Sequence, residues 1–307
     1  MKYIPLQKLR AITTILSGSS VVQFVRRHKR AIASLVLLLF FIFIAIYLTS
    51  HPDVPQSVLR LGYANAAVII LFYGGVILTN IGIMYTTIRL CRKKLPLKKG
   101  ILLMIYSSVI NFFGPLQSGP GVRAVYLKRT ISLRIRDYTY AMLAYYLSFA
   151  AINVSLLFSN TLPWLSVLGI AATLILTIIT MRALVPRALK KYVLFIFILT
   201  VIQVMVMVCI YSVELAAVTS SAHYSLFQTT AYTASANLAL FVSLTPGAIG
   251  IREAFLVFSH SLHAIPLSSI VAAGIVDRAI YVVFLVLLFL VSSSLHLRDM
   301  FIGQKKL

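Results

Sequence analysis

The stretch YVLFIFILTVIQVMVMVCIYSV, residues 192–213, contains no charged side chain and decides the class of fold. A helix needs roughly 20 apolar residues to cross the hydrocarbon core of a bilayer, so this stretch predicts a membrane span. Five further runs of similar length and composition are bounded by charged or turn residues. These additional predicted spans are residues 31–50, 64–88, 138–159, 164–181 and 268–291.

The composition of the whole chain agrees with a membrane protein and excludes a soluble globular one. Hydrophobic residues make up 60% of the chain, charged residues 11%, and the mean hydropathy is +0.97. The formal charge of +22 comes from 28 Lys and Arg against 6 acidic residues. These cations fall in short clusters between apolar runs, whereas a nucleic-acid binder needs a continuous basic patch, so we expect no nucleic-acid partner.

The placement of the basic clusters predicts the topology. Loops rich in Lys and Arg stay on the cytoplasmic side, and the loops at residues 51–63, 160–163 and 214–223 hold Arg60 as their sole Lys or Arg. Those three loops are therefore predicted outside, and both termini inside, in a multi-pass protein of a bacterial inner (plasma) membrane. The predicted cytoplasmic clusters are residues 1–30, 89–99, 123–136, 182–191 and the segment after residue 295.

Two further apolar regions, residues 101–127 and 224–262, are interrupted in their middles by proline, glycine and small polar residues. The first has basic residues on both flanks, and the second has a cation-free loop on either side, so neither is expected to change the side of the membrane. We therefore predict two re-entrant helical hairpins, each shielded from lipid by protein or by a wet cavity. Eight ordinary spans with two kinks are the alternative.

An internal repeat supports the hairpin interpretation. Residues 121–127, GVRAVYL, align with residues 250–256, GIREAFL, with identity at the glycine, the arginine and the leucine. The same offset superposes span, span, hairpin and span on a second copy, and the odd number of crossings inverts that copy. The predicted fold is an all-α integral membrane protein built as an inverted repeat of three spans plus one re-entrant hairpin. Its predicted parts are a cytoplasmic segment 1–30, repeats 31–159 and 160–294, and a cytoplasmic tail 295–307.

The interruptions predict an anion site. Proline removes a backbone donor and glycine frees the backbone torsions, so a helix stops and a new one begins with unpaired N–H groups. An arginine follows each interruption, at Arg123 and Arg252, and a guanidinium can bind phosphate through two hydrogen bonds. The predicted helix-breaking residues are Pro115, Gly119, Pro120, Gly121, Pro246, Gly247 and Gly250.

Charged residues within the apolar runs complete the candidate lipid-phosphate site. Placing an arginine at the centre of a span costs on the order of 3 kcal/mol, so Arg252 and Arg278 should face a cavity or a partner. Glu253 and Asp277 are the available counter-charges, and we expect pairs across the bundle, such as Arg252 with Asp277. Asn111 and Thr245 could donate further hydrogen bonds. A structural ion-pair network without a ligand is the alternative.

At both interruptions the sequence resembles the lysylphosphatidylglycerol synthase transmembrane-region family. Residues 243–254, SLTPGAIGIREA, look like the family's Pro-Gly, Gly, hydrophobic, Arg-Glu signature. The segment from Asn111 through Pro115 to Arg123 resembles its earlier motif, and Arg278 with Tyr281 resembles the arginine and aromatic of its last span. The likeness extends over roughly residues 30 to 295.

The resemblance implies a flippase-like protein that moves an anionic phospholipid or a lipid-linked phosphate between leaflets. It departs from the family at Pro120-Gly121-Val122-Arg123, where the family usually has an acid ahead of the arginine. No soluble aminoacyl-transfer domain follows in the sequence, so lysyl transfer would need a lipid-modifying enzyme as partner. Self-association into a homo-oligomer is compatible with the sequence.

Other functional classes have less support. A membrane enzyme acting on a polyprenyl or phospholipid phosphate would need clustered carboxylates, and the predicted site offers only Glu253 and Asp277. His260 and His263 have a spacing that could hold a metal, but no acid or cysteine accompanies them, so we predict no metal and no cofactor. A non-transporting partner of a lipid synthase is the third alternative.

Overall fold

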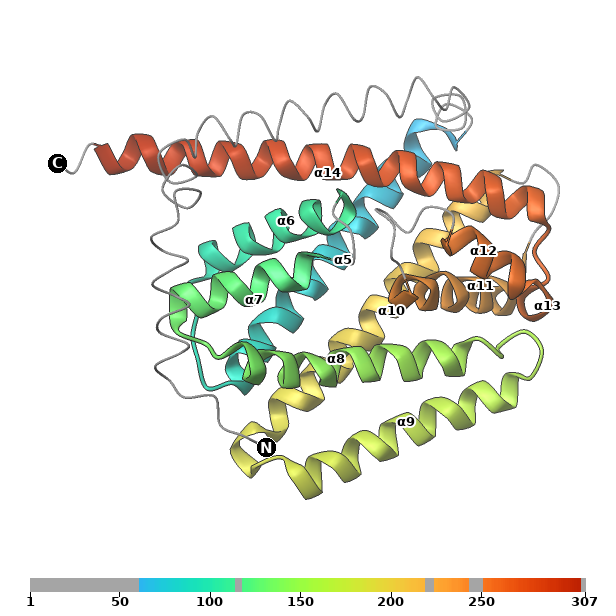
Figure 1. The fold of residues 1–307 in the computed structure, drawn as a ribbon. Coiled ribbons are helices and arrows are strands. Elements are labelled where there is room, and N and C mark those ends of the chain that lie inside the picture. The colour runs from blue at the N-terminus through green and yellow to red at the C-terminus, as the bar shows by residue number, and fades with distance from the viewer. Residues whose placement is uncertain (1–60, 114–117, 219–223, 243–250, 305–307) are drawn as a thin grey trace. The chain divides into compact units, whose positions relative to one another are not determined.

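The computed structural model describes residues 61–113, 118–218, 224–242 and 251–304, which belong to one unit extending over Gln56–Leu307. These residues form helices joined by short connections, with no strand in the described ranges (Figure 1). The all-helical class is therefore confirmed. The predicted span at residues 31–50 and the basic segment 1–30 lie outside the described residues.

Five of the described helices are long and apolar enough to cross a membrane. They correspond to the five predicted spans within the described ranges, which supports a membrane-embedded protein. A short 3-10 helix, η1 (Arg187–Leu189), leads into the fourth of them. The five helices are α5 (Tyr63–Leu90), α8 (Ile135–Leu156), α9 (Pro163–Leu184), α10 (Lys190–Val218) and α14 (Leu267–Gln304).

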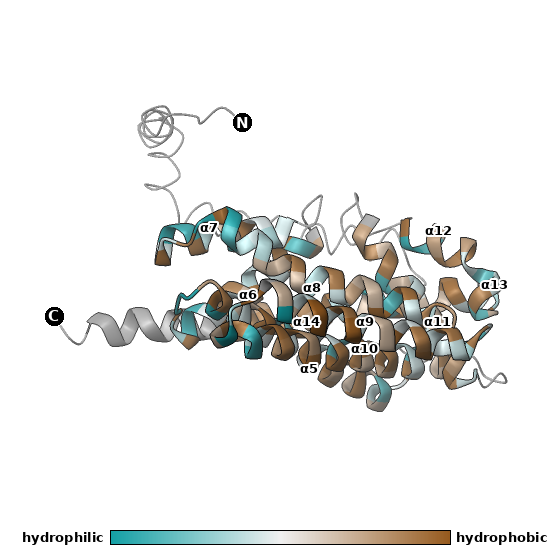
Figure 2. Ribbon diagram, turned by 90° about the horizontal axis from the view of Figure 1, so that it is seen from below, coloured by the Kyte–Doolittle hydropathy of each residue, from teal (hydrophilic) through white to brown (hydrophobic). Residues whose placement is uncertain are grey.

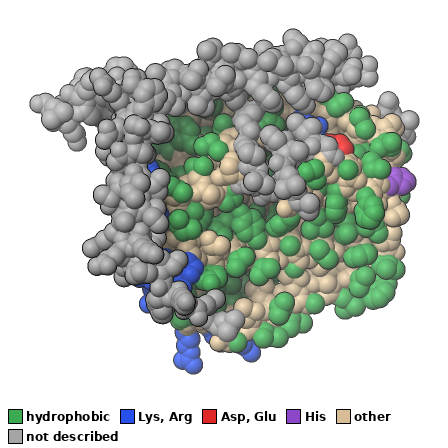
Figure 3. All heavy atoms as spheres, in the orientation of Figure 1, with side chains coloured by type: hydrophobic (Ala, Val, Ile, Leu, Met, Phe, Trp, Pro, Cys, Tyr) green, Lys and Arg blue, Asp and Glu red, His purple; other side chains and the backbone are tan. Residues whose placement is uncertain are grey.

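The surface of these helices is apolar over much of its area. Hydrophobic side chains are spread over the described part of the face shown in Figure 3, and the long helices are hydrophobic along most of their lengths (Figure 2). Helix α9 is the most exposed of the five and presents Leu168, Ile175 and Ile179 to its surroundings. So much exposed apolar surface suits contact with lipid rather than water.

Lys and Arg gather at one end of the described part of the chain, which we call the basic end (lower left in Figure 3). Figure 1 places three connections there, between α5 and α6, between α7 and α8, and between α9 and α10. All three connections belong to predicted cytoplasmic clusters. The grouping on one side is what the distribution of charge along the sequence predicts.

The two interrupted regions each contain a pair of short helices. The first pair is α6 (Leu97–Phe113) with α7 (Ser118–Ile131), and the second begins with α11 (Leu226–Ala239). In the second, the 3-10 helix η2 (Leu240–Val242) follows α11, and α12 (Ile251–Phe258) packs back against α11 before the short α13 (His260–His263). The α6–α7 pair lies toward the basic end and the α11–α12 pair toward the opposite end (Figure 1).

The first interruption is shorter than predicted, because α7 already begins at Ser118. Gly119, Pro120 and Gly121 therefore lie in the first turn of a helix, where proline is tolerated since its missing N–H would have no intrahelical partner. Gly119 serves the packing of the pair instead, because a Cβ atom there would lie 2.6 Å from the carbonyl oxygen of Ser107 on α6. The Gly119 N–H donates to Asn111 Oδ1 at 3.2 Å, so an α6 side chain caps α7.

Local sequence also explains how other helices begin. Helix α9 begins at Pro163, whose missing N–H leaves no donor unpaired at the first helical position. Helix α11 begins with a capping box, in which the Gln228 N–H donates to Ser225 Oγ at 3.2 Å and the Ser225 N–H donates to Gln228 Oε1 at 2.9 Å. The capping box satisfies backbone donors of α11 at the end of the protein opposite the basic end.

The core forms where α5 and α10 pack along one another, with α14 crossing both. Ile69, Ile210 and Val276 are among the side chains wholly buried there. The short helices α6 and α12 also pack against α14, so the inner parts of both helix pairs are held by the same long helix.

One predicted boundary is wrong. Glu214 was expected in an outer loop, residues 214–223, but α10 continues to Val218 and the Glu214 side chain is fully buried. A charged residue was interpreted there as the end of a span, although a helix can continue past a single buried charge. The last candidate span, Leu267–Ser292, agrees with the predicted one, and α14 continues as a helix through the predicted tail to Gln304.

Candidate functional site

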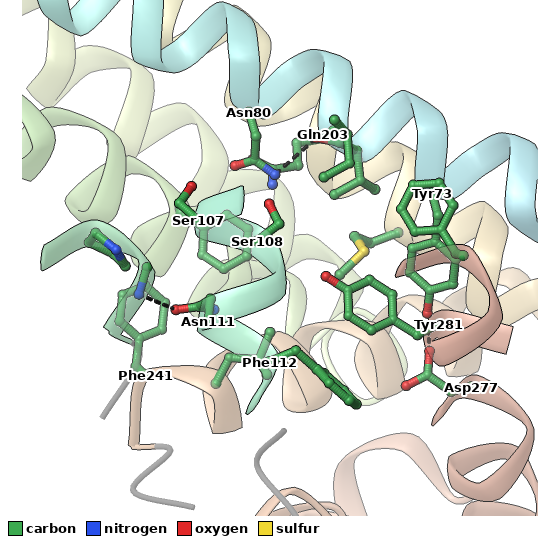
Figure 4. Close-up of a pocket in the computed structure, with 18 of the residues that line it drawn as sticks. Tyr73, Asn80, Ser107, Ser108, Asn111, Phe112, Gln203, Phe241, Asp277 and Tyr281 are labelled. Atoms are coloured by element: carbon green, nitrogen blue, oxygen red, sulfur yellow. Dashed lines mark hydrogen bonds between the residues drawn. The ribbon is translucent and has the colours of Figure 1, made fainter. Parts of the chain in front are cut away.

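A cavity of about 260 Å³ lies among the helices, and all of the long helices except α9 contribute to its wall (Figure 4). The inner ends of both short-helix pairs also line it, through residues of α6, α7, η2 and α12. This volume lies just below the range of about 300–1,000 Å³ that is usual for small-molecule sites. The predicted site residues that line it are Asn111, Gly119, Pro120, Arg123, Arg252, Asp277 and Arg278.

Three arginines reach this cavity from three different helices. Arg123 comes from α7, Arg252 from α12 and Arg278 from α14. Arg123 and Arg252 each lie near the start of a helix that follows an interruption, so the structure brings together the two positions that the internal repeat singles out. Gly121, also on α7, has open space beside it, because an added Cβ atom would meet nothing within 4 Å. Pro115, Thr245, Pro246, Gly247 and Gly250 lie outside the described residues.

Two ion pairs link α12 to α14. Arg252 Nη1 donates to Asp277 Oδ2, which confirms the pair expected from the sequence, and Arg278 Nη2 donates to Glu253 Oε1. Two consecutive residues on α12 thus pair with two consecutive residues on α14. The Tyr73 hydroxyl of α5 donates to the other Asp277 oxygen, Oδ1. Asp277 therefore holds both an arginine and a tyrosine from neighbouring helices.

Arg252 is the most deeply buried of the three arginines, with 6% of its surface exposed. Its guanidinium carbon lies 5.0 Å from the centre of the Tyr211 ring, which adds a cation–π contact to the ion pair with Asp277. Its Nε and Nη2 atoms have no hydrogen-bond partner among the described residues. These two N–H groups leave Arg252 with donors for a further anionic contact, in addition to its pair with Asp277.

Arg123 differs from the other two because it has no carboxylate partner among the described residues. Its Nη1 lies 3.1 Å from Met104 Sδ, a weak acceptor, and its guanidinium lies close to the hydroxyls of Tyr138 and Tyr146. Its Nε is buried without a partner among the described residues. Of the three arginines at the cavity, Arg123 is therefore the one whose charge is least compensated by the described residues.

An uncharged polar group forms another part of the wall. Figure 4 shows Asn80, Ser107, Ser108, Asn111 and Gln203 on the side of the cavity away from Asp277. Asn80 and Ser107 each donate to a carbonyl of their own helix, which leaves the Asn80 carbonyl oxygen available. The cavity therefore combines cationic donors with neutral amides and hydroxyls.

Four residues at or near the site were missed by the sequence analysis: Tyr73, Gln203, Tyr211 and Glu214. Each stands alone within an apolar run or directly beside one, and a single polar residue at such a place has no local pattern that indicates its partner. Glu214 is fully buried, lies close to Arg252 and Asp277, and neither of its carboxyl oxygens has a hydrogen-bond donor among the described residues. A signal did exist, because acidic residues are rare in this chain and Glu214 adjoins an apolar run.

His263, one of the two histidines with metal-like spacing, is held by backbone atoms on both sides of its ring. The Ile265 N–H donates to His263 Nδ1 at 3.1 Å, and His263 Nε2 lies 3.0 Å from the Leu256 carbonyl oxygen, which fits a neutral ring that donates from Nε2. Burial lowers the pKa of His263 below its ordinary value, the bond to Leu256 opposes the shift, and His260 adds to it. No cluster of metal-binding side chains occurs in the described part of the chain.

Comparison with protein-family models, with curated proteins and with solved structures finds no match. The fold and the cavity by themselves define a class: an all-helical, membrane-embedded protein with a cavity lined by three arginines.

Proposed function

We propose that this protein binds the phosphate headgroup of an anionic lipid in the cavity and carries the lipid between the two leaflets of the membrane. The observation that supports this most is the convergence of Arg123, Arg252 and Arg278 on one cavity within an apolar helix bundle. Arginine in a membrane domain is costly, so three of them around one cavity favour an anionic ligand over a purely structural role.

The three arginines have different roles in this account, because they have different partners. Arg252 and Arg278 are each held by a carboxylate, so they are fixed in place and partly neutralised. Arg123 has no such partner among the described residues and supplies the charge that a phosphate would neutralise. A guanidinium presents a planar fork of donors that matches two phosphate oxygens, which makes Arg123 the principal phosphate ligand in this account.

Movement between leaflets is supported by the arrangement of the two short-helix pairs. We interpret α6–α7 and α11–α12 as re-entrant hairpins of an inverted repeat, entering from opposite faces of the membrane and lining the cavity with their inner ends. A site between inverted repeats near mid-depth can open alternately to either side when one repeat rocks against the other. In this account both termini are cytoplasmic and the membrane is a bacterial inner membrane.

The identity of the ligand as a lipid draws on the resemblance to the lysylphosphatidylglycerol synthase transmembrane-region family. Membership of that family is part of the proposal. The cavity supports an anionic headgroup, because Asp277 and Glu253 are already engaged by arginines. A lipid-modifying enzyme that supplies or receives the lipid is compatible with the site.

Reconstitution into liposomes tests the function. A phosphatidylglycerol with a fluorescent acyl chain is distributed over both leaflets, and a membrane-impermeant reductant then removes the outer signal. The proposal expects the inner signal to decay in a protein-dependent way, and only the outer half to be lost in protein-free liposomes. Mass spectrometry of the lipids separates the alternatives: a dephosphorylated product would show a membrane enzyme, and unchanged lipid without movement would favour a non-transporting partner.

A further inference from the structure

Two phenylalanines occupy matching places at the inner ends of the short-helix pairs. Phe112 is the next-to-last residue of α6, and Phe241 lies in η2, so each comes just before an interruption. They are 129 residues apart, as are Gly121 and Gly250 in the internal repeat. Both phenylalanines line the cavity of Figure 4. The offset of the repeat therefore relates two phenylalanines of the cavity wall as well as two arginines.

Each phenylalanine contacts the middle of a long helix. The ring centre of Phe112 lies 5.2 Å from that of Tyr281, near the middle of the candidate span in α14. The ring centre of Phe241 lies 6.1 Å from that of Tyr146 and 5.7 Å from that of Phe149, both near the middle of α8. In a membrane crossed by α8 and α14, the inner ends of both pairs therefore lie at about mid-depth.

Phe241 and Asn111 mark a mouth of the cavity. Both line the cavity, yet 42% of the surface of Phe241 is exposed, and Asn111 is exposed as well. A side chain that belongs both to a cavity wall and to the surface of the protein lies where the two meet. At the depth of Tyr146 and Phe149, an exposed phenylalanine suits contact with hydrocarbon. The mouth therefore opens toward the acyl chains of the bilayer.

The size of the cavity explains why a bound lipid needs such a mouth. A volume of about 260 Å³ holds a headgroup but not two long acyl chains. Each methylene that left the hydrocarbon for a cavity lined by arginines would also cost free energy, so the chains stay in the bilayer while the phosphate lies on Arg123. The lipid must therefore pass through the cavity wall at a place that is apolar and near mid-depth.

We infer that the acyl chains of the bound lipid leave the cavity through this mouth, between the inner ends of the short-helix pairs and the middle of α8, and that Phe241 contacts them. This inference rests on the proposed function and locates the hydrocarbon part of its lipid. The rings of Phe241 and Phe149 offer the chains an apolar surface with no polar group to desolvate.

The test measures contact between a tryptophan at the mouth and brominated acyl chains, which quench tryptophan fluorescence. Trp164→Phe removes the single tryptophan of the chain, and Phe241→Trp adds the reporter. Ile175→Trp is the control at matched depth, because Ile175 is exposed near the middle of α9, the long helix outside the cavity wall. The full-length protein is reconstituted into phosphatidylcholine bilayers with increasing shares of phosphatidylglycerol that carries brominated chains.

Binding of the phosphate by Arg123 should concentrate the brominated lipid at the mouth. The Phe241→Trp protein should therefore reach half of its maximal quenching at about a tenfold lower share of brominated lipid than the Ile175→Trp protein. Adding Arg123→Gln should abolish this difference, and brominated diacylglycerol, which has no phosphate, should quench both reporters alike. Tyr146→Trp, on the α8 side of the mouth, is a second reporter and should show the same preference as Phe241→Trp.

The possible failures of the inference and of the proposed function are distinguishable. Equal midpoints for Phe241→Trp, Tyr146→Trp and Ile175→Trp, in proteins that still bind phosphatidylglycerol, would overturn the inference and leave the proposed function standing. Quenching of the α9 reporter alone would overturn it as well, because the mouth would then face water. Absence of both binding and movement of phosphatidylglycerol in the unaltered protein would overturn the proposed function, and the inference with it.

Discussion

Arg252 on α12 donates a hydrogen bond to Asp277 on α14, and both side chains are buried at the edge of the cavity. Breaking such a pair by removing one partner leaves an uncompensated charge in a poorly solvated place, which typically costs about 3–5 kcal/mol. The pair is thus a structural requirement for the site, whatever ligand the cavity holds.

Asp277→Asn should destabilise the protein by about 3–5 kcal/mol, because Arg252 loses its counter-charge. The effect is measured as the unfolding temperature in detergent, with size-exclusion chromatography used to monitor the loss of folded protein on heating. The matched control is Asp137→Asn, which removes an exposed carboxylate 3.9 Å from Arg136 and should change stability by less than about 1 kcal/mol. An Asp277→Asn protein that unfolds at the temperature of the unaltered protein would show that Arg252 does not depend on this partner.

Restoring neutrality offers a second check on the same pair. The double variant Arg252→Met with Asp277→Leu removes both charges together and should recover much of the stability lost in Asp277→Asn, since a hydrophobic replacement of a buried pair is often neutral. A double variant as unstable as Asp277→Asn would indicate that the shapes of the two side chains, and not their charges, hold α12 to α14.

Two glycines of α7 should respond in opposite ways to alanine. Gly119→Ala would place a Cβ 2.6 Å from the Ser107 carbonyl oxygen and force α6 and α7 apart, which we expect to cost about 1–3 kcal/mol. Gly121→Ala meets nothing within 4 Å and should leave the midpoint of unfolding unchanged or slightly raised, because alanine favours a helix. Equal effects of the two changes would contradict the close packing of this pair.

The neutral state of His263 predicts a pH dependence of stability. Its pKa is lowered in the folded protein, so the unfolded chain binds the extra proton more readily. The contribution to stability is therefore present above the unfolded value of about 6.5 and is lost as the pH falls below it towards the lowered pKa. Protonation would also place a hydrogen on Nδ1, which accepts the bond from the Ile265 N–H.

Thermal unfolding between about pH 7.5 and 5 measures this slope. His263→Gln should be less stable at neutral pH but should lose most of the slope, whereas the control His260→Gln changes an exposed ring and should keep it. A slope that persists in His263→Gln would assign the pH dependence to another group.

Much of the fold could be predicted from the sequence because membrane spans are recorded in it directly. A run such as residues 192–213 has one stable solution in a bilayer, a helix that satisfies its own backbone hydrogen bonds. The Arg252–Asp277 pair was also predictable, since two opposite charges in apolar segments have strong reason to meet. The boundaries were less predictable, as Glu214 shows, because a single charge ends an apolar run equally well in a loop or in a buried site.

The rest of the site depends on contacts between helices that the order of residues does not record. Nothing adjacent to Tyr73 in the sequence shows that its hydroxyl reaches Asp277, and nothing next to Gln203 shows that it lines the same cavity as Arg123. Gly119 was interpreted as a helix breaker, although its main constraint is the approach of Ser107 from α6. Such features arise from packing in three dimensions, which local patterns do not specify.

Arg123→Gln examines the central claim, because Arg123 lines the cavity and no carboxylate among the described residues loses an ion-pair partner when Arg123 is replaced. The protein should therefore stay folded while losing a charged contact to phosphate, a loss that corresponds to about a tenfold or greater reduction in rate. Arg129→Gln, an exposed arginine near the end of the same helix, is the control and should behave as the unaltered protein.

The most direct measurement is the rate at which fluorescent phosphatidylglycerol crosses the membrane of liposomes that contain the unaltered protein, Arg123→Gln or Arg129→Gln at equal amounts. The account predicts fast crossing with the unaltered protein and with Arg129→Gln, and crossing slowed by about tenfold or more with Arg123→Gln. Equal rates for Arg123→Gln and the unaltered protein, with both well folded, would contradict a role for the cavity in moving lipid phosphate.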